Sequence, residues 1–151
     1  MKNQLLNGHI LTLLIGGLIY VALRVESLIL FKWISAISLY TPIKKLREIT
    51  LPIKDNLPEW FLFSFPDGLW VFSYISLILL IWRNKITKHN FVWLFIIPFV
   101  AIFSEIGQKI KIISGTFDLV DLLFYSSGSI LPFIIFTNLL TLKKKQLCKT
   151  K

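Results

Sequence analysis

The stretch Trp60–Trp82, WFLFSFPDGLWVFSYISLILLIW, decides the fold of this chain. Between its two terminal tryptophans lie 21 residues that contain one charged side chain, Asp67. About 17–25 helical residues cross the hydrocarbon core of a bilayer, and tryptophans gather at both of its interfaces. We therefore predict a membrane-spanning helix over residues 61–81.

Three further apolar runs have a comparable length, at residues 5–23, 91–107 and 119–142. Of the 151 residues, 55% are hydrophobic and only 17% are charged, whereas about a quarter of a soluble domain is charged. The residues after the first run, Leu23–Glu26, offer no small-x-small cleavage site, so we interpret this run as a span and not as a signal peptide. The sequence predicts an all-α integral membrane protein, with one domain over residues 1–151 and four transmembrane helices.

Residues 24–60, between the first two spans, are expected to lie outside the hydrocarbon as a loop or at the interface. Their most apolar part, Leu28–Tyr40, is 13 residues long and is interrupted by Lys32, so it is too short to cross the bilayer. We predict one interfacial or re-entrant helix there, and the sequence leaves open which of the two it is. Three prolines then interrupt residues 41–59, which we interpret as a loop with at most a short helix around 43–49.

The net charge of +9 indicates the orientation in the membrane. We expect no nucleic-acid partner, because basic residues are retained at a lipid surface, where anionic headgroups attract them. The loop after the second span is basic, and so is the C-terminal tail, which places both on the cytoplasmic side together with the N-terminus. The basic residues that carry this prediction are Lys2, Arg83, Lys85, Lys88, Lys143, Lys144, Lys145, Lys149 and Lys151.

Four of the eight acidic residues lie inside the predicted spans or at their ends. A charge at the bilayer centre costs about 2.5–3.5 kcal/mol on insertion scales, so an intramembrane acid is a functional-site hypothesis by default. Asp67 lies about 9 Å into the second span at 1.5 Å per residue. Glu105 lies near the end of the third span, and Asp118 and Asp121 lie at the start of the fourth. Three helices thus place acids at one depth.

The polar residues of these spans also share helix faces, since residues three, four and seven apart lie on one side of a helix. We predict that these stripes face one another and form an outward-facing acidic pocket that binds a polar ligand. Packing of small and polar residues between helices, capping of the fourth span by Asp118, and ion pairs of Glu105 and Asp121 with nearby lysines are alternative roles. The candidate ligand-binding residues are Asp67, Trp70, Glu105, Gln108, Asp118, Asp121, Tyr125 and Gly128.

The segments SEIGQ (104–108) and GTFDLVD (115–121), followed by Tyr125 and Gly128, resemble the signature of the VanZ-like membrane family. That signature is similar to Glu-x-x-Gln, a short polar loop, and an acid with Asp-x-x-x-Asn-x-x-Gly at the start of the last helix. Tyr125 replaces the usual Asn, and Gly115 stands where many members have Arg. The resemblance extends over Ser64–Gly128 and includes Asp67, although Gly68 and apolar residues replace the Lys and His that usually follow it.

The resemblance implies a small multi-pass protein of the bacterial plasma membrane that acts in the cell envelope. Some members of the family are linked to resistance to glycopeptide antibiotics such as teicoplanin. We expect a protein that binds an envelope-lipid intermediate or a polar headgroup. A small proton- or cation-coupled transporter and a non-catalytic membrane subunit with structural acids are alternatives.

An enzyme acting on lipid-linked substrates is a further alternative. The sequence favours a non-catalytic role, because it contains no visible nucleophile, metal-binding or cofactor motif. We therefore expect no metal and no cofactor. The bilayer is the expected partner, and the sequence names neither a protein partner nor the ligand.

Overall fold

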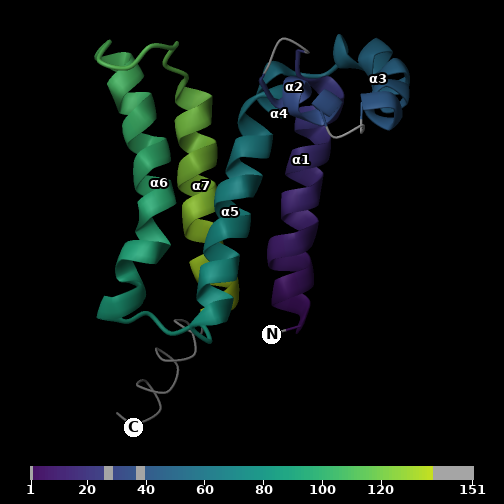
Figure 1. The fold of residues 1–151 in the computed structure, drawn as a ribbon. Coiled ribbons are helices and arrows are strands. Elements are labelled where there is room, and N and C mark those ends of the chain that lie inside the picture. Colours follow the sequence, from purple (N-terminus) through teal and green to yellow (C-terminus); the bar gives the residue numbers. More distant parts are fainter. Residues whose placement is uncertain (1, 26–28, 37–39, 138–151) are drawn as a thin grey trace, which may run out of the picture.

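The computed structural model describes residues 2–25, 29–36 and 40–137, and these residues form helices joined by turns (Figure 1). Four of the helical segments are long and apolar enough to cross a membrane. They are Gln4–Leu23, Ser64–Ile81, Lys88–Lys109 and Leu119–Phe136. The prediction of an all-α chain with four helices of this kind is confirmed.

The first of these segments is continuous but changes its winding. It starts as a π-helix, η1 (Gln4–Ile10), and continues as the α-helix α1 (Leu11–Leu23). The other three are α5 (Ser64–Ile81), α6 (Lys88–Lys109) and α7 (Leu119–Phe136). Successive long helices run in opposite directions, so the N-terminus and the end of α7 lie at the same end of the bundle (Figure 1).

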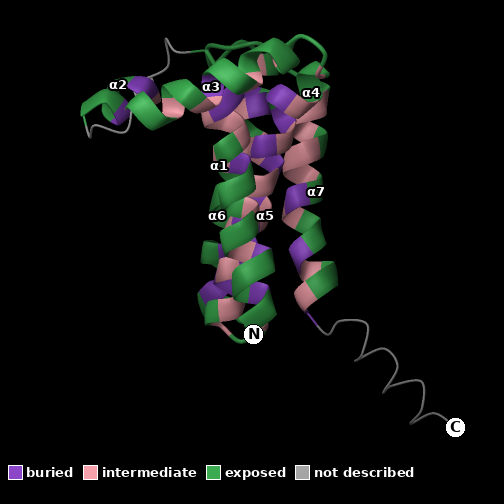
Figure 2. Ribbon diagram, turned by 90° about the vertical axis from the view of Figure 1, so that its right-hand side faces the viewer, coloured by how far each residue is buried: buried purple, intermediate pink, exposed green. Residues whose placement is uncertain are grey.

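Helix α5 is the centre of the bundle and packs against η1, α1, α6 and α7. Half of its residues are buried, against 17%, 22% and 11% in the spans Gln4–Leu23, Lys88–Lys109 and Leu119–Phe136. Its buried face forms a core with Leu94 of α6. The outer faces of the other helices expose large apolar side chains such as Val100 and Ile135, as lipid-facing helices do. Figure 2 shows this pattern along the bundle.

The boundaries of the long helices differ from the predicted ones by a few residues. The span expected to start at residue 61 starts at Ser64, because Phe63 separates a single helical turn, α4 (Glu59–Leu62), from α5. Pro66 then occupies the first turn of α5, where no intrahelical N–H bond is needed. Helix α7 ends at Phe136, and residues 138–142 of the predicted fourth span lie outside the described residues.

The prediction of one helix, with at most a short second helix around 43–49, underestimated the helix content between the first two spans. The structure places two there, α2 (Ile29–Ala36) and α3 (Tyr40–Lys54), besides the turn α4. The loop expected over 41–59 is therefore mostly helical. Pro42 permits this, since it lies in the first turn of α3, where no intrahelical N–H bond is made. Pro52 lies inside the helix near its C-terminal end, so it removes one intrahelical bond close to that end. Residues 26–28 and 37–39, which include parts of the predicted Leu28–Tyr40 helix, lie outside the described residues.

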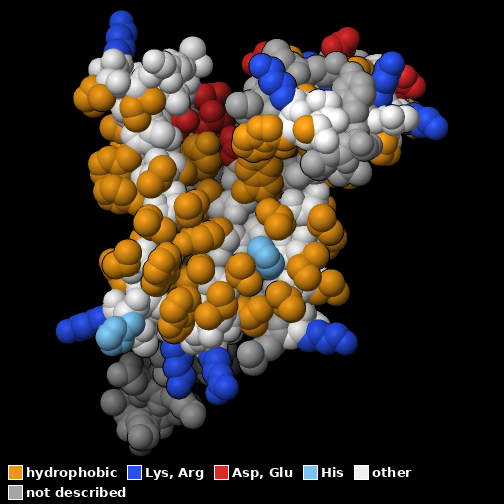
Figure 3. All heavy atoms as spheres, viewed as in Figure 1, with side chains coloured by type: hydrophobic (Ala, Val, Ile, Leu, Met, Phe, Trp, Pro, Cys, Tyr) orange, Lys and Arg blue, Asp and Glu red, His pale blue; other side chains and the backbone are white. Residues whose placement is uncertain are grey.

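Charged side chains divide unequally between the two ends of the bundle (Figure 3). The acids that the structure describes lie at the end where α6 leads into α7, together with several basic residues. The opposite end carries Lys2, Arg83, Lys85 and Lys88, and no acid among the described residues. The candidate site therefore lies at the end away from the N-terminus.

Candidate functional site

A close contact between α5 and α7 determines the geometry of the site. A Cβ atom added to Gly128 would collide with the backbone oxygen of Gly68, and one added to Gly68 would lie 3.0 Å from the backbone oxygen of Phe124. Gly128 therefore has no space for a side chain, and a side chain at Gly68 would be tightly packed. Small residues permit such close approach of membrane helices. The structure thus places Gly128 in helix packing, which was one of the alternatives raised by the sequence.

Asp67 and Tyr125 join the same two helices next to this contact. The Tyr125 hydroxyl donates a hydrogen bond of 3.2 Å to Oδ2 of Asp67. The two residues are 58 positions apart in the chain, so the bond depends on the packing of α5 against α7. The side chain of Tyr125 is long enough to reach from α7 to the carboxylate on α5.

Glu105 ties the end of α6 to the start of α7. It is only 4% exposed, and its Oε2 accepts a hydrogen bond of 3.3 Å from the backbone N–H of Asp118. Asp118 itself is the N-cap of α7, since its Oδ1 accepts a 2.8 Å bond from the N–H of Val120. The capping role considered for Asp118 is therefore present, and Glu105 supports it.

Asp121 completes the acidic group, which we define as Asp67, Glu105 and Asp121. Their charges interact with one another, although they come from three different helices. Oδ1 of Asp121 is buried and has no hydrogen-bond partner in the part of the chain that the structure describes. In Figure 3, acidic side chains lie in a recess between the end of α6 and the region of α2 and α3.

Arg24 is a member of the site that sequence reasoning missed. It follows the last residue of α1, and its positive charge attracts the carboxylate of Asp67. Its guanidinium carbon lies 5.1 Å from the ring centroid of Tyr20 and 4.6 Å from that of Phe63. Its Nε is buried and has no hydrogen-bond partner among the described residues. The sequence contained one signal for this role, because Arg24 is a basic residue at the end of the first span and lies at the same depth as the acids.

Trp70 and Gln108 support the walls of the site. Trp70 packs on α1, where its ring centroid lies 5.1 Å from that of Tyr20 and its Nε1 fills the space above Gly16. The side chain of Gln108 lies against Gly115 in the loop between α6 and α7. Gly115 has a φ of +144°, which few residues with a side chain adopt, so an Arg at this position would be strained.

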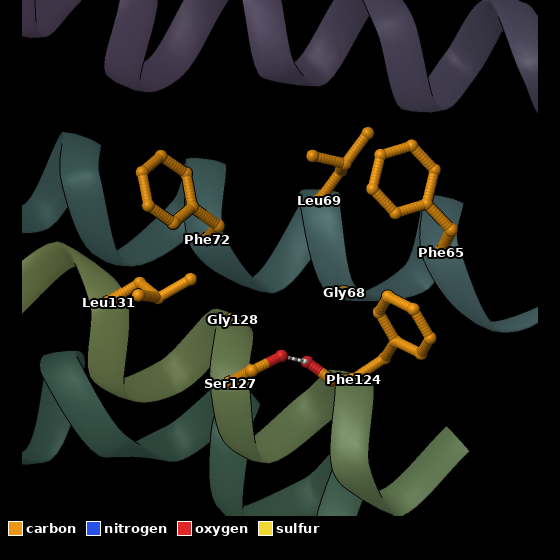
Figure 4. Close-up of a pocket in the computed structure, with 8 residues that line it drawn as sticks. All are labelled: Phe65, Gly68, Leu69, Phe72, Phe124, Ser127, Gly128 and Leu131. Carbon is orange, nitrogen blue, oxygen red and sulfur yellow. Dashed lines mark hydrogen bonds between the residues drawn. The ribbon is translucent and has the colours of Figure 1, made fainter. Parts of the chain in front are cut away.

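A separate apolar groove lies between α5 and α7 (Figure 4). Its volume is about 120 Å³, and Ser127 bonds its hydroxyl to the backbone oxygen of Phe124 at the edge. By helical periodicity, Asp67 projects from the opposite face of α5, so the groove does not belong to the acidic group. Its lining residues are Phe65, Gly68, Leu69, Phe72, Phe124, Ser127, Gly128 and Leu131.

A polar seam between η1 and α5 was also missed by sequence reasoning. Nδ1 of His9 lies 2.7 Å from the hydroxyl oxygen of Ser73, and that hydroxyl lies 3.1 Å from the backbone oxygen of His9. Nearer the N-terminus, the amides of Gln4 and Asn84 exchange two hydrogen bonds, of 2.8 and 3.0 Å.

The described residues contain no group of three or more His, Cys, Asp or Glu side chains that could hold a metal ion. What the site offers is a set of carboxylate acceptors, one tyrosine hydroxyl and one guanidinium. No family model, characterised protein or solved structure matches the chain.

Proposed function

We propose that the chain is an integral membrane protein of the bacterial cell envelope that binds a polar lipid headgroup through the acidic group. The electrostatic interaction of three carboxylates from three helices at one end of the bundle supports this proposal more than any other observation. The resemblance to VanZ-like proteins supports the plasma membrane as its location, with both termini cytoplasmic and the acidic group on the outer side.

Asp121 and Arg24 each have a buried polar atom without a hydrogen-bond partner among the described residues, and this favours a binding role over a purely structural one. A buried polar group without a hydrogen-bond partner costs about 1–3 kcal/mol, which packing alone does not explain. One such atom belongs to the acidic group, and the other belongs to the arginine whose charge attracts Asp67. Oδ1 of Asp121 needs a donor, and Nε of Arg24 needs an acceptor. An ammonium or hydroxyl group would supply the donor, and a phosphate oxygen would supply the acceptor. A phospholipid headgroup such as ethanolamine phosphate carries both.

A small proton- or cation-coupled transporter is the second candidate, and the polar seam favours it. His9 and Ser73 place a titratable ring beside a hydroxyl inside the first and second spans. Further along α5, the hydroxyl oxygen of Ser76 is buried without a partner among the described residues. Polar groups therefore continue from the acidic end of α5 toward its other end, as a conduction path requires.

Binding of two lipids that differ only in donor capacity tests the first proposal. Phosphatidylethanolamine has an ammonium with N–H donors, whereas phosphatidylcholine carries the same charge without them. We expect native mass spectrometry of the detergent-solubilised chain to show retention of phosphatidylethanolamine over phosphatidylcholine. Asp121→Asn and Glu105→Gln should abolish this preference, and Asp55→Asn, which changes an exposed acid outside the site, should retain it.

The variants separate the three functional hypotheses. Equal retention of both lipids by the unaltered chain would refute headgroup binding by the acidic group. If Asp121→Asn and Glu105→Gln bind normally but accumulate poorly, the acids are structural. If proteoliposomes show a proton or cation flux that His9→Gln abolishes, the transporter is the better description.

A further inference from the structure

Helices α2 and α3 form a shelf at one end of the bundle, which we call the α2–α3 shelf. Figures 1 and 2 show that it extends sideways beside the end of α1 and does not continue along the long helices. Helix α2 has 8 residues, about 12 Å of helix, so it cannot cross a bilayer. Its position beside the end of α1 places the shelf at the level where the long helices end.

One face of α3 is fixed on the end of α1 by Arg47 and Thr50. Arg47 is 5% exposed, and its Nη1 donates hydrogen bonds of 2.8 Å to the backbone oxygen of Val21 and 2.7 Å to that of Arg24. The hydroxyl of Thr50 donates a bond of 3.2 Å to the backbone oxygen of Ala22. These bonds satisfy carbonyl groups that the end of any helix leaves free. They also prevent α3 from rotating about its axis.

The fixed orientation leaves large apolar side chains of the shelf uncovered. Trp33 of α2 is 62% exposed, and Ile49 and Ile53 of α3 are 70% and 54% exposed. Ile49 and Ile53 are four residues apart and thus share one face of the helix. An apolar strip of this kind, next to helices that cross the bilayer, is suited to the boundary between headgroups and acyl chains.

The rest of the shelf surface is basic. Lys44 and Lys45 of α3 are exposed, and apart from the buried Arg47 the two helices carry four lysines and a single acid, Glu48. Asp55 and Glu59 lie beyond the end of α3. Lys45 lies four residues before Ile49 on the same face of α3, and Lys44 lies next to it, so both lysines border the apolar strip. Lysines beside an apolar strip can extend their ammonium groups to lipid phosphates and are typical of segments that lie in the surface of an anionic leaflet.

We propose that the α2–α3 shelf lies flat in the headgroup region and binds anionic phospholipids through Lys44 and Lys45. Trp33, Ile49 and Ile53 then insert into the boundary of the same leaflet. The proposal does not depend on the function of the acidic group, because the two use different residues and lipids of different charge. The bilayer itself is the partner, and no soluble protein is required.

Fluorescence quenching in nanodiscs tests the proposal on the full chain. The probe is an NBD label on Ile49→Cys, in a background where Cys148→Ser removes the native thiol. Ile49 is largely exposed, so its replacement removes little packing. The nanodiscs consist of phosphatidylcholine with a small, equal fraction of either brominated phosphatidylglycerol or brominated phosphatidylcholine. We expect both to quench the label, and the anionic lipid to quench it more strongly at low salt.

Two matched double variants test whether the lysines of the α2–α3 shelf cause the preference for anionic lipid. A basic residue near the surface contributes about a five-fold preference for anionic lipid. The double variant Lys44→Gln/Lys45→Gln should therefore lose most of the selectivity while the label stays quenched by lipid. Lys85→Gln/Lys88→Gln, at the other end of the bundle, should leave the selectivity unchanged. Equal quenching by the two brominated lipids would overturn the proposal. Quenching by aqueous iodide but by neither lipid would also overturn it, and would leave the basic face available to an acidic soluble partner.

Discussion

Replacement of Gly128 by alanine should separate α5 from α7 and destabilise the bundle. The added methyl group would collide with the backbone oxygen of Gly68, which cannot move aside as a flexible side chain could. Gly68 is itself packed closely on α7, because a Cβ atom added to it would lie 3.0 Å from the backbone oxygen of Phe124. The clash is therefore relieved only when the two helices move apart.

The magnitude follows from a comparison with Gly17, the matched control. A Cβ atom at Gly17 meets nothing within 4 Å, so Gly17→Ala changes helix propensity alone. Both substitutions gain up to about 1 kcal/mol from the better helix propensity of alanine. Forcing an extra methyl group into a packed contact costs about 1–3 kcal/mol. The difference in unfolding free energy between the two variants should therefore be about 1–3 kcal/mol, with Gly128→Ala the less stable.

Unfolding in detergent, followed by intrinsic tryptophan fluorescence, measures this difference. Tyr125→Phe in both backgrounds adds a second readout, because it removes the hydrogen bond to Asp67 that depends on the same contact. Its cost should be smaller in the Gly128→Ala background, where the helices have already separated. If Gly128→Ala were as stable as Gly17→Ala, the close contact between α5 and α7 would not exist as described.

Three further predictions concern other parts of the chain. Tyr125→Phe alone should lower the unfolding free energy by about 1.5–3 kcal/mol, the range for a hydrogen bond to a charged group, and an unchanged value in the same unfolding assay would show that the bond with Asp67 is not formed. Arg47→Gln should release α3 from the end of α1, so limited proteolysis should cut the α2–α3 shelf several-fold faster, whereas the exposed Lys44→Gln should leave the rate as it was. A reporter fused after Lys88, the first residue of α6 after the basic turn, should report the cytoplasm, and a signal from the outside would reverse the orientation argued from the basic residues.

The long helices were predictable from the sequence because their signal is local. An apolar run of sufficient length has few alternatives in a bilayer, and tryptophans mark its ends. The length of α3 was underestimated, because prolines count against a helix in any window and only a short helix around 43–49 was expected. Pro42 is tolerated because it lies in the first turn, and this is visible once the helix boundaries are known, whereas Pro52 lies inside the helix near its C-terminal end.

The site was predictable in part for a related reason. Helical spacing places Asp67, Glu105 and Asp121 at one depth, so their convergence followed from the order of the helices. Arg24 and His9 were missed because their partners lie about 43 and 64 residues away, on α5, and only the packing of the first span against α5 brings them together. Trp70 shared a stripe with Asp67 but packs on α1, since periodicity says which residues share a face and not which helix that face meets.

The bonds from Arg47 and Thr50 to the end of α1 have a consequence for how the protein is made. The chain leaves the ribosome with its N-terminus first, so α1 is complete about 25 residues before its last carbonyl groups acquire their partners. Until then those groups require another hydrogen-bond partner, such as water. The end of α1 therefore acquires its final hydrogen bonds only when α3 packs on it, so the α2–α3 shelf completes a helix that the chain formed earlier.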